Sequence, residues 1–584
     1  MMMVISLVAL VLSIGAVGQF VPAPTDLTTK QGYAGVSVRY KEVPVGICET
    51  RSYVKSYAGY ADVAKDQHIF FWFFEARNID PEEAPLTIWI NGGPGSSSMI
   101  GLFQENGPCG IDQSGAVVDN PYSWSNVSNM LYIDQPTQTG FSYSIPVPGY
   151  LNPNTDRFIV LDSTVCPEGI TTCGTYSLPD RALTATSTAS AAPNFYLTLQ
   201  GFMGAFPQYS GNDIHFASES YGGHYGPIFN DYILKKNREA KAGTKRIDLK
   251  SVLIGNGWFD PIVQYPAQFN MTVFPGNTYD HFPFDVSIEA LMHDNTYGPG
   301  NCVEKEKTCY ASGADEDCID ADEYCYINVE NMLDDYADRD GYDIRYLTPD
   351  PFPYEYYIDY LNTPHVQSAI GAFQNFSEGS ETVAEAFGTT GDNGRESDTI
   401  HGIQSLLWQG VQVSLYFGDA DYVCNWLGGQ VVADKVNAPG YSAAGFVDIQ
   451  TSDGITHGQV RQAGIFSFVR IYEAGHGVPF YQPLAALEFF ERAIGWTDIA
   501  TGSHNLWPRY ITRGTEKSTY REGWGTVQTE VTPDGSTYNT MTNTPNPPVE
   551  RRSLNAQKKR GLLRKPKPAS AKKEHVRATE KPDS

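Results

Sequence analysis

A serine between small residues is the first candidate for chemistry. Ser220 lies in Ser218-Glu-Ser-Tyr-Gly-Gly223, after the apolar run Asp213–Ala217 and before a helix-like segment. A nucleophile on a sharp strand-to-helix turn needs small residues two positions before and after it, because larger side chains would collide with nearby backbone. The usual form is G-x-S-x-G. Here Ser218 takes the first position, so a serine that merely caps a helix is the competing interpretation.

A serine hydroxyl is a weak nucleophile and needs a base, which an acid must orient. Where the serine lies on such a turn, the acid and then the histidine follow on loops after later strands. Asp421 comes directly after the strand-like run Val411–Phe417, and His476 comes after Ile465–Ile471 in Gly-rich sequence. We therefore predict Ser220 as nucleophile, Asp421 as orienting acid and His476 as base.

A glycine-rich loop, Trp89-Ile-Asn-Gly-Gly-Pro-Gly-Ser-Ser-Ser98, follows the apolar run Leu86–Ile90. Backbone N–H groups of such a loop can stabilise a developing oxyanion. A phosphate-binding loop is the alternative, but the lysine of the G-x-x-x-x-G-K-[ST] pattern is missing. An ordinary turn is the other alternative. All three elements, in this order, favour nucleophilic catalysis.

The elements that must position these residues alternate between apolar runs and helix-like segments. From about residue 51 to 260, continuous apolar strands separated by helices indicate a mostly parallel sheet covered on both faces. Residues 262–400 are aromatic, acidic and rich in cysteine, and strand signals resume after 411. We predict an α/β fold whose main domain comprises 19–261 and 401–525, with 262–400 as a cap.

The charge is distributed unevenly along the 584 residues. The net charge is −26, yet residues 551–584 hold 12 Lys and Arg against 3 Asp and Glu, which leaves 29 against 64 in residues 1–550. Binding of nucleic-acid phosphates requires basic surface, so the acidic body excludes a nucleic-acid partner. From 526 onward Thr, Pro and Asn and then basic residues dominate, which predicts a disordered basic tail, 526–584.

The N-terminus predicts export. Val4–Val17 is apolar and ends in small residues, which is typical of a secretory signal peptide over residues 1–18, with a hydrophobic strand as the alternative. No other stretch approaches the ~18 apolar residues of a transmembrane helix. We expect a secreted protein, with the vacuole as the alternative location. Sequons predict N-glycosylation at Asn126, Asn270 and Asn375.

The chain has nine cysteines, four of them within 24 residues. In an exported chain this pattern indicates disulfides that join loops, with one thiol left over. A zinc cluster is the alternative, but no C-x-x-C pair and no nearby pair of histidines supports one, so no metal or other cofactor is predicted. Spacing suggests the pairs Cys48–Cys109, Cys166–Cys173, Cys302–Cys325 and Cys309–Cys318.

Taken together, these segments resemble the serine carboxypeptidase family, and most of all its secreted fungal members. The resemblance extends from about residue 57 to 483. The matching segments include Phe70-Phe-Trp-Phe-Phe-Glu, Trp89–Ser98, Gly101-Leu-Phe-Gln-Glu-Asn-Gly-Pro, Glu219-Ser-Tyr-Gly-Gly-His-Tyr, Ile254-Gly-Asn-Gly-Trp-Phe-Asp-Pro, Cys424-Asn-Trp-Leu-Gly and Ala474-Gly-His-Gly-Val-Pro. The resemblance implies an α/β-hydrolase fold with a cap, and removal of single residues from peptide and protein C-termini through an acyl-enzyme.

The resemblance also implies roles for further residues. The backbone N–H groups of Gly93 and Tyr221 are expected to form the oxyanion hole, and Cys424 is expected to be the free thiol. The residues implied in binding the substrate's C-terminal carboxylate are Asn91, Gly92, Glu105 and Glu219. Two carboxylic acids that face a carboxylate repel it unless a proton is shared, so we expect an acidic optimum for peptides.

Two departures from the family pattern bear on the site. Ser96 stands where the family usually has a cysteine, so a disulfide from that loop to the cap is not expected. Gly477 replaces a common methionine, which enlarges the pocket of the leaving residue. An esterase or acyltransferase with the same triad, or a non-catalytic binding protein on this fold, are the alternative functions.

Overall fold

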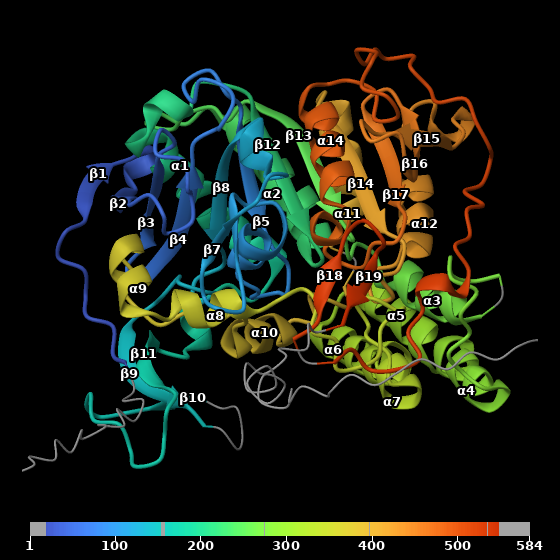
Figure 1. The fold of residues 1–584 in the computed structure, drawn as a ribbon, viewed down its shortest axis with the longest axis horizontal. Helices are drawn as coiled ribbons and strands as arrows, with labels where there is room; N and C mark the ends of the chain where they lie inside the picture. Colours follow the sequence, from blue (N-terminus) through green and yellow to red (C-terminus); the bar gives the residue numbers. More distant parts are fainter. Residues whose placement is uncertain (1–18, 153–157, 274, 396, 534, 548–584) are drawn as a thin grey trace, which may run out of the picture.

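A twelve-stranded mixed sheet forms the centre of the molecule (Figure 1). The computed structural model describes residues 19–152, 158–273, 275–395, 397–533 and 535–547. The sheet order is β1-β2-β3-β4-β8-β5-β12-β13-β14-β17-β16-β15. The six strands from β8 to β17 are mutually parallel, and antiparallel strands complete both edges. The predicted α/β fold is confirmed.

The bounds of the central strands follow the apolar runs of the sequence, whereas the edge strand β1 is polar and exposed. The strands are β1 (Thr28–Gln31), β2 (Ser37–Val43), β3 (Ser56–Ala64), β4 (Gln67–Phe74), β5 (Leu86–Ile90), β8 (Asn129–Asp134), β12 (Ile214–Glu219), β13 (Leu249–Gly255), β14 (Gln412–Gly418), β15 (Val447–Gln450), β16 (Thr456–Ala463) and β17 (Phe466–Ile471). Every residue of β5, β8, β12, β14 and β17 is buried, because helices or loops cover both faces. This explains why the runs are mostly apolar and do not alternate with exposed polar residues, although β12 and β17 also bury His215, Glu219 and Arg470.

Helices cover both faces of the sheet and form two separate apolar cores with it. One core contains side chains of α1 (Thr188–Ala205), α2 (Gly222–Glu239), α11 (Thr399–Trp408) and α12 (Trp426–Val436). The other contains side chains of α8 (Tyr356–Leu361), α9 (Pro364–Ile370), α13 (Val478–Tyr481) and α14 (Pro483–Ile494). The loops at the carboxyl ends of the parallel strands are therefore held from two sides.

The regular secondary structure of the residues predicted as a cap is helical, with irregular segments between the helices. These residues contain α3 (Pro261–Thr272), α4 (Val286–Tyr297), α5 (Cys302–Ser312), α6 (Asp315–Cys325), the π-helix η6 (Tyr326–Glu330), α7 (Met332–Ala337) and α10 (Glu381–Gly388), besides α8, α9 and the start of α11. Two disulfides, Cys302–Cys325 and Cys309–Cys318, join α5 to α6 as a helical hairpin. The other pairs are Cys48–Cys109 and Cys166–Cys173, and Cys424 is free. These are the pairs that the spacing suggested.

Two regions differ from the sequence expectation. A three-stranded sheet of β9 (Pro146–Leu151), β10 (Phe158–Val160) and β11 (Cys173–Ser177) projects from the main domain as an addition that apolar patterning did not indicate. The prediction of a disordered tail from 526 is wrong for its first part, because β18 (Thr537–Asn539) and β19 (Thr544–Asn546) form a hairpin. The predicted signal peptide and residues 548–584 lie outside the described residues.

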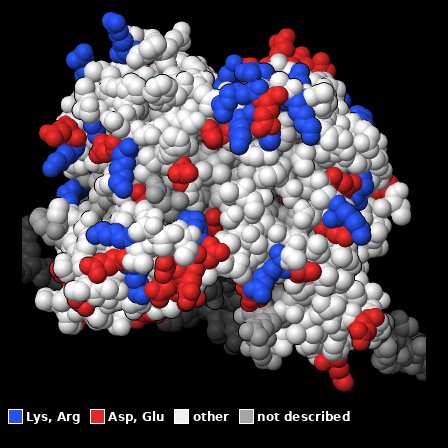
Figure 2. Space-filling view, turned by 180° about the vertical axis from the view of Figure 1, so that it is seen from behind, with Lys and Arg blue, Asp and Glu red and all other residues white. Residues whose placement is uncertain are grey.

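The charged surface shows no stripe of one sign on the face opposite that of Figure 1. Figure 2 shows Lys and Arg interspersed with Asp and Glu over this face, with uncharged surface between them. Within the described part of the chain, no helix combines the length and the apolar character that crossing a bilayer requires.

Candidate active site

Ser220 lies on the turn between β12 and α2 with a backbone φ of +63°. This left-handed conformation is uncommon for a residue other than glycine. It is held by hydrogen bonds from Ser220 N–H to Gly255 O (3.1 Å) and from the N–H groups of Gly223 (2.9 Å) and Trp258 (2.8 Å) to Ser220 O. The side chain is therefore held on a strained turn, as a nucleophile requires. Ser220 is partly exposed, and its Oγ makes no hydrogen bond within the described residues.

Crowding around the turn explains the need for small residues. A Cβ atom added to Gly222 would lie 2.6 Å from both Cβ and Oγ of Ser218, and one added to Gly92 would lie 2.4 Å from Tyr221 N. Real Cβ atoms do not approach backbone this closely. Ser218 fits the position that is usually glycine because its hydroxyl donates to Gly222 O (3.2 Å).

Asp421 and His476 meet at the carboxyl ends of β14 and β17. His476 Nδ1 lies 2.8 Å from Asp421 Oδ2, and the Asp421 side chain is fully buried. Burial lowers the pKa of His476, but Asp421, together with the negative charges of Glu105 and Asp340, raises it by more, so the net pKa is above its ordinary value. This bond orients the ring and favours the tautomer with Nδ1 protonated, which leaves Nε2 to act as a base.

Asn256, which the sequence analysis did not single out, supports this pair. Its Nδ2 donates to Asp421 Oδ2 (2.8 Å), and its Oδ1 accepts from Gly418 N–H (2.9 Å). It has a φ of +37° directly after β13 and lies between two glycines. A polar residue between glycines at the end of a central strand was the signal that could have identified it.

Asp419 joins the loop that carries Asp421 to the loop that carries His476. Its N–H donates to Ile471 O (2.9 Å), and Ala420 N–H donates to Ala474 O (2.8 Å). Its Oδ1 accepts from Glu473 N–H (2.9 Å) and its Oδ2 accepts from Arg470 (3.2 Å). The two loops therefore form one backbone-linked unit, which fixes the position of Asp421 relative to His476.

The glycine-rich loop after β5 is anchored by the buried Asp134. Asp134 Oδ1 accepts from Ser97 Oγ (2.7 Å) and Ser98 N–H (2.8 Å), while Oδ2 accepts from Phe141 N–H (2.9 Å). Burial raises the pKa of Asp134 to about 6. Ser96, where no disulfide was expected, instead forms an antiparallel bridge with Gly379 of the cap. The loop is thus fixed on both sides.

Two backbone N–H groups are available for an oxyanion. Those of Gly93 and Tyr221 make no hydrogen bond within the described residues. The Tyr221 side chain is fixed independently, because its hydroxyl donates to Asp392 Oδ2 (2.6 Å). Asp392 also accepts from Thr188 N–H (2.8 Å). Asp392 lies in a loop without a recognisable motif, and sequence reasoning missed it.

Glu105 and Glu219 form a pair of buried carboxyl groups, only 5% and 3% exposed. Both Glu105 oxygens and Glu219 Oε2 have no hydrogen-bond donor within the described residues. Burial raises the pKa of both groups, and the Glu105 carboxylate raises that of Glu219 further, well above its ordinary value. Two carboxyls in this position stabilise each other only by sharing a proton.

Asn91 is oriented toward this pair. Its Oδ1 accepts from Trp89 Nε1 (2.7 Å) and Gly101 N–H (3.0 Å), so Nδ2 points away from both and donates to Glu219 Oε1 (3.4 Å). Because two donors fix Oδ1, the orientation of the amide is unambiguous. The side chain thus presents a hydrogen-bond donor to the carboxyl pair.

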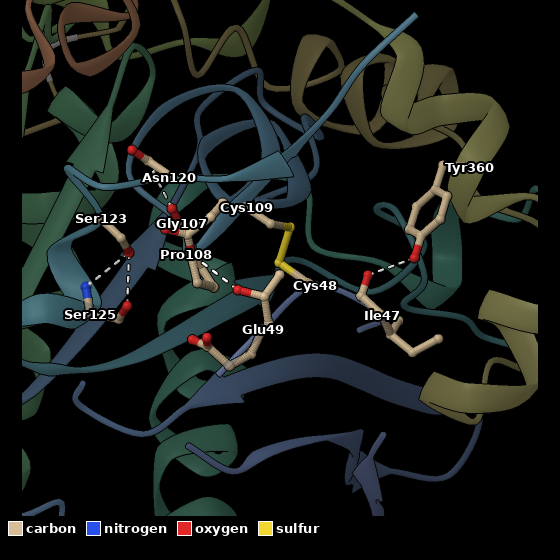
Figure 3. Close-up of a disulfide and its surroundings, with 12 residues drawn as sticks. Ile47, Cys48, Glu49, Gly107, Pro108, Cys109, Asn120, Ser123, Ser125 and Tyr360 are labelled. Carbon is tan, nitrogen blue, oxygen red and sulfur yellow. Dashed lines mark hydrogen bonds between the residues drawn. A yellow bond between two sulfur atoms is a disulfide. The ribbon is translucent and has the colours of Figure 1, made fainter. Parts of the chain in front are cut away.

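Glu105 ends the π-helix η2 (Gly101–Glu105), an element that often occurs at functional sites. The chain after it is held by the disulfide between Cys48 and Cys109 (Figure 3). Asn120 Nδ2 donates to Glu105 O (3.2 Å) and Gly107 O (2.9 Å) beside this disulfide. The disulfide therefore fixes the segment that positions the buried Glu105 carboxyl.

Gly477, the neighbour of His476, faces the carboxyl pair. A Cβ atom added there would lie 3.6 Å from the Glu105 carboxyl carbon, an ordinary contact distance. This places the base and Glu105 at one site and leaves open space where a larger residue would shield Glu105.

Cys424 lies beside the acid and base. Its Sγ and the side-chain ligand atoms of Asp421 and His476 lie within 4.8 Å of one another, which is compact enough for a metal ion. However, burial chiefly raises the pKa of Cys424 well above its ordinary value, whereas a metal requires the thiolate. Asp421 Oδ2 is also already engaged by two donors. The group therefore fits an acid–base pair with a neutral thiol better than a metal centre.

The structure opposes two of the three predicted glycosylation sites. Asn126 is 9% exposed and donates to Pro121 O (2.8 Å). Asn375 is 7% exposed and its Oδ1 accepts from Thr175 N–H (2.8 Å). A glycan on either amide would have to displace buried contacts. Asn270 on α3 is exposed and stays a candidate.

Comparison with known proteins gives a consistent result. A family model described as serine carboxypeptidase matches residues 46–495. The chain is 39% identical over 530 residues to carboxypeptidase S1 homolog B of Arthroderma otae, covering 84% of this chain and 80% of that protein. It is 38% identical over 455 residues to carboxypeptidase S1 of Penicillium janthinellum, covering 77% and 97%.

A solved structure with the same fold is that of a prohormone-processing carboxypeptidase from Saccharomyces cerevisiae. The TM-score is 0.62 at 23% sequence identity, and the match covers 78% of this chain and 95% of that one.

Proposed function

The chain belongs to the serine carboxypeptidase family and is a serine-type carboxypeptidase, and we propose that Ser220, His476 and Asp421 carry out its reaction. The observation that carries this proposal is the buried carboxyl pair of Glu105 and Glu219 beside the strained serine. A peptide C-terminus offers a carboxylate that can accept the proton shared by this pair. An internal peptide bond offers no such group, so the pair selects the end of a chain.

In the proposed acylation step, Ser220 Oγ attacks the carbonyl carbon of the last peptide bond while His476 Nε2 takes the hydroxyl proton. The carbonyl oxygen becomes an oxyanion, to which the N–H groups of Gly93 and Tyr221 donate. The C–N bond then breaks, His476 returns the proton to the nitrogen, and the C-terminal amino acid leaves. The rest of the peptide stays on Ser220 as an ester.

Deacylation repeats these roles with water. His476 Nε2 takes a proton from a water molecule whose oxygen attacks the ester carbon, and the same proton passes to Ser220 Oγ when the C–O bond breaks. Asp421 accepts the hydrogen bond of His476 Nδ1 throughout and stabilises the imidazolium that forms twice in the cycle.

The two buried pairs give the proposed pH dependence. His476 must be neutral to act as a base, so activity falls as pH drops through its raised pKa. Glu219 must be protonated to bind a carboxylate, so binding weakens as pH rises through its own raised pKa. We therefore propose a bell-shaped profile of kcat/KM for peptides, limited at low pH by protonation of His476 and at high pH by ionisation of Glu219.

Four disulfides and the exposed sequon Asn270 support an oxidising compartment. Together with the predicted signal peptide, they favour secretion, with the vacuole as the alternative destination. Peptide and protein C-termini are the proposed substrates.

The proposal is tested by release of free amino acid from an N-blocked dipeptide between pH 4 and 8. We expect release that is lost in Ser220→Ala and with a serine-directed phosphonate, but kept with a metal chelator. If only a simple ester is cleaved, and only by the wild type, the triad works and the role of Glu105 and Glu219 is wrong. Equal release by wild type and Ser220→Ala would overturn the role of the serine.

A further inference from the structure

The chain continues past the residues that the family model matches and returns to the active-site loops. We call residues 518–533 and 535–547 the C-terminal strap; it includes β18 and β19 and is drawn in red in Figure 1. The strap first meets the end of β17. Arg470 donates to Ser518 Oγ (2.8 Å) and Tyr520 O (3.0 Å), and the Tyr520 ring stacks on Tyr472 with centroids 3.8 Å apart.

The strap then holds both ends of the loop that carries His476, residues 472–481. At the start of this loop, Asn543 Nδ2 donates to Glu473 Oε2 (2.6 Å). At its end, the Tyr538 ring lies 5.3 Å from the rings of both Phe480 and Tyr481. Asn543 is only 8% exposed, so its bond to Glu473 is shielded from water. The strap therefore closes the outer side of the loop.

A second set of contacts reaches the same loop through the cap segment 339–347. Gln528 N–H donates to Arg345 O (2.9 Å), and Arg339 donates to Gln528 O (2.8 Å). In the same cap segment, Tyr342 O accepts from His476 N–H (2.9 Å) and Ile344 N–H donates to Ala420 O (2.9 Å). The cap segment is therefore held between the strap and the loops of the acid and base.

The strap also reaches the recognition side of the site. Thr540 lines a cavity of about 310 Å³ together with Glu105 and Phe480. One segment outside the family match thus touches the base loop, the cap segment that holds it, and the wall near the carboxyl pair.

We propose that the C-terminal strap is a positioning element for the base His476, and that the bond between Asn543 and Glu473 is its principal contact. This inference rests on the proposed role of His476. Glu473 has a φ of +52° and donates its N–H to Asp419, so a shift of Glu473 displaces the loop three residues before the base. A base displaced by about 1 Å loses up to ~100-fold in rate without losing substrate binding.

The test first removes the hydrogen-bond donor of Asn543 and then restores a donor on the residue opposite, Glu473. Asn543 has a φ of +50°, a conformation that aspartate also tolerates, so Asn543→Asp removes the donor with little backbone strain. We expect kcat for a blocked dipeptide to fall about five-fold or more while KM stays within about two-fold, since only the base is displaced. Adding Glu473→Gln supplies a new donor facing the new carboxylate and should restore kcat. A purely structural role does not predict this rescue.

Two further variants keep the proposal testable if Asn543→Asp folds poorly. Tyr538→Leu removes the ring contacts and should lower kcat without changing KM. Tyr538→Phe keeps the ring contacts with Phe480 and Tyr481 and should lower kcat much less than Tyr538→Leu. Met541→Ala, at an 81% exposed position of the strap, is the matched control. Titration of each variant with the serine-directed phosphonate gives the concentration of competent active sites, and kcat is calculated per competent site.

His476→Ala is the reference for interpretation. Wild-type kcat in His476→Ala overturns the proposed function and the strap's role with it. An inactive His476→Ala beside unchanged kcat in Asn543→Asp and Tyr538→Leu overturns the strap's role alone, as does failure of Glu473→Gln to restore kcat.

Discussion

The candidate active site holds two pairs of side chains, Asp421 with His476 and Glu105 with Glu219. Each pair includes a buried carboxyl group, and the pairs differ in the chemical group that faces this carboxyl. Asp421 meets the imidazole of His476 and the amide of Asn256, each at 2.8 Å. Glu105 meets Glu219, and three of their four oxygens have no donor within the described residues. Buried carboxyl groups thus form an oriented pair with an imidazole in one place and a pair with raised pKa values in the other, which we propose shares a proton.

The two pairs are therefore proposed to have different functions, one in proton transfer and one in substrate binding. In the proposed mechanism, the Asp421 pair acts on the step in which a proton is moved, so its loss should appear in kcat. The Glu105 pair is proposed to act on the charge of the ligand, so its loss should appear in KM and in the dependence of KM on pH. Each substitution predicted below alters one of these pairs, or its immediate surroundings, and keeps both residues of the other pair.

The largest effect is expected for Asp421→Asn. The substitution keeps the shape but presents the wrong hydrogen-bond partner to His476 Nδ1, so we expect kcat to fall roughly 10³- to 10⁴-fold. KM should stay within about three-fold, because the carboxyl pair is untouched. Steady-state kinetics on a blocked dipeptide at the pH optimum measures both values. A kcat within tenfold of wild type would contradict the role of Asp421.

Asn256→Gly should have a smaller effect in the same direction. Glycine accepts the φ of +37° at this position, so the variant removes the amide with the least backbone strain. Without its second donor, Asp421 can rotate away from His476, and we expect kcat to fall about 10- to 100-fold at similar KM. A rise in KM with unchanged kcat would place Asn256 in recognition instead.

Glu219→Gln should alter recognition and leave the base in place. In wild type, KM should rise with pH as Glu219 ionises above its raised pKa. Glutamine stays neutral, so KM should become nearly independent of pH, with kcat/KM about tenfold above wild type at pH 8. The C-terminal amide of the same dipeptide serves as a control substrate without a carboxylate. A KM that rises with pH in parallel with wild type would refute the shared proton.

The smallest effect is expected for Gly477→Ala. The added methyl would contact Glu105 at 3.6 Å and exclude water from its carboxyl group, which raises the pKa of Glu105 further. We expect KM to change about two- to three-fold and its rise with pH to begin at slightly higher pH, with kcat unchanged. Gly388→Ala, where an added Cβ has no neighbour within 4 Å, is the matched control. A change in kcat alone would show that residue 477 acts on His476 rather than on Glu105.

The sequence predicted those parts of the site that depend on local chain chemistry. The apolar runs that became β5, β12, β14 and β17 could be identified because a strand buried on both faces favours a mostly apolar run over an alternating one. The candidate residues Ser220, Asp421 and His476 were identified from the order in which their motifs follow one another along the chain. Local chemistry thus identified the candidate residues and the strands that carry them.

The supporting residues could not be predicted, because their partners are distant in the sequence. Asp392 and Tyr221 are 171 residues apart, and Asn543 and Glu473 are 70 apart. The composition after residue 526 predicts disorder, since it is poor in apolar residues. The hairpin forms nevertheless because Tyr538 packs against aromatic rings that the main domain and cap supply. The burial of Asn126 and Asn375 could not be read from their sequons for the same reason, since burial is a tertiary property.

Proton uptake on ligand binding tests the shared proton most directly. An N-blocked amino acid, which carries the carboxylate of the substrate, would be titrated into the enzyme by calorimetry in two buffers of different ionisation enthalpy. We predict uptake that grows as the pH rises through the raised pKa of Glu219 and approaches one proton per site, and that disappears in Glu219→Gln. Binding without proton uptake at any pH from 5 to 8.5, or equal uptake in Glu219→Gln, would contradict the account.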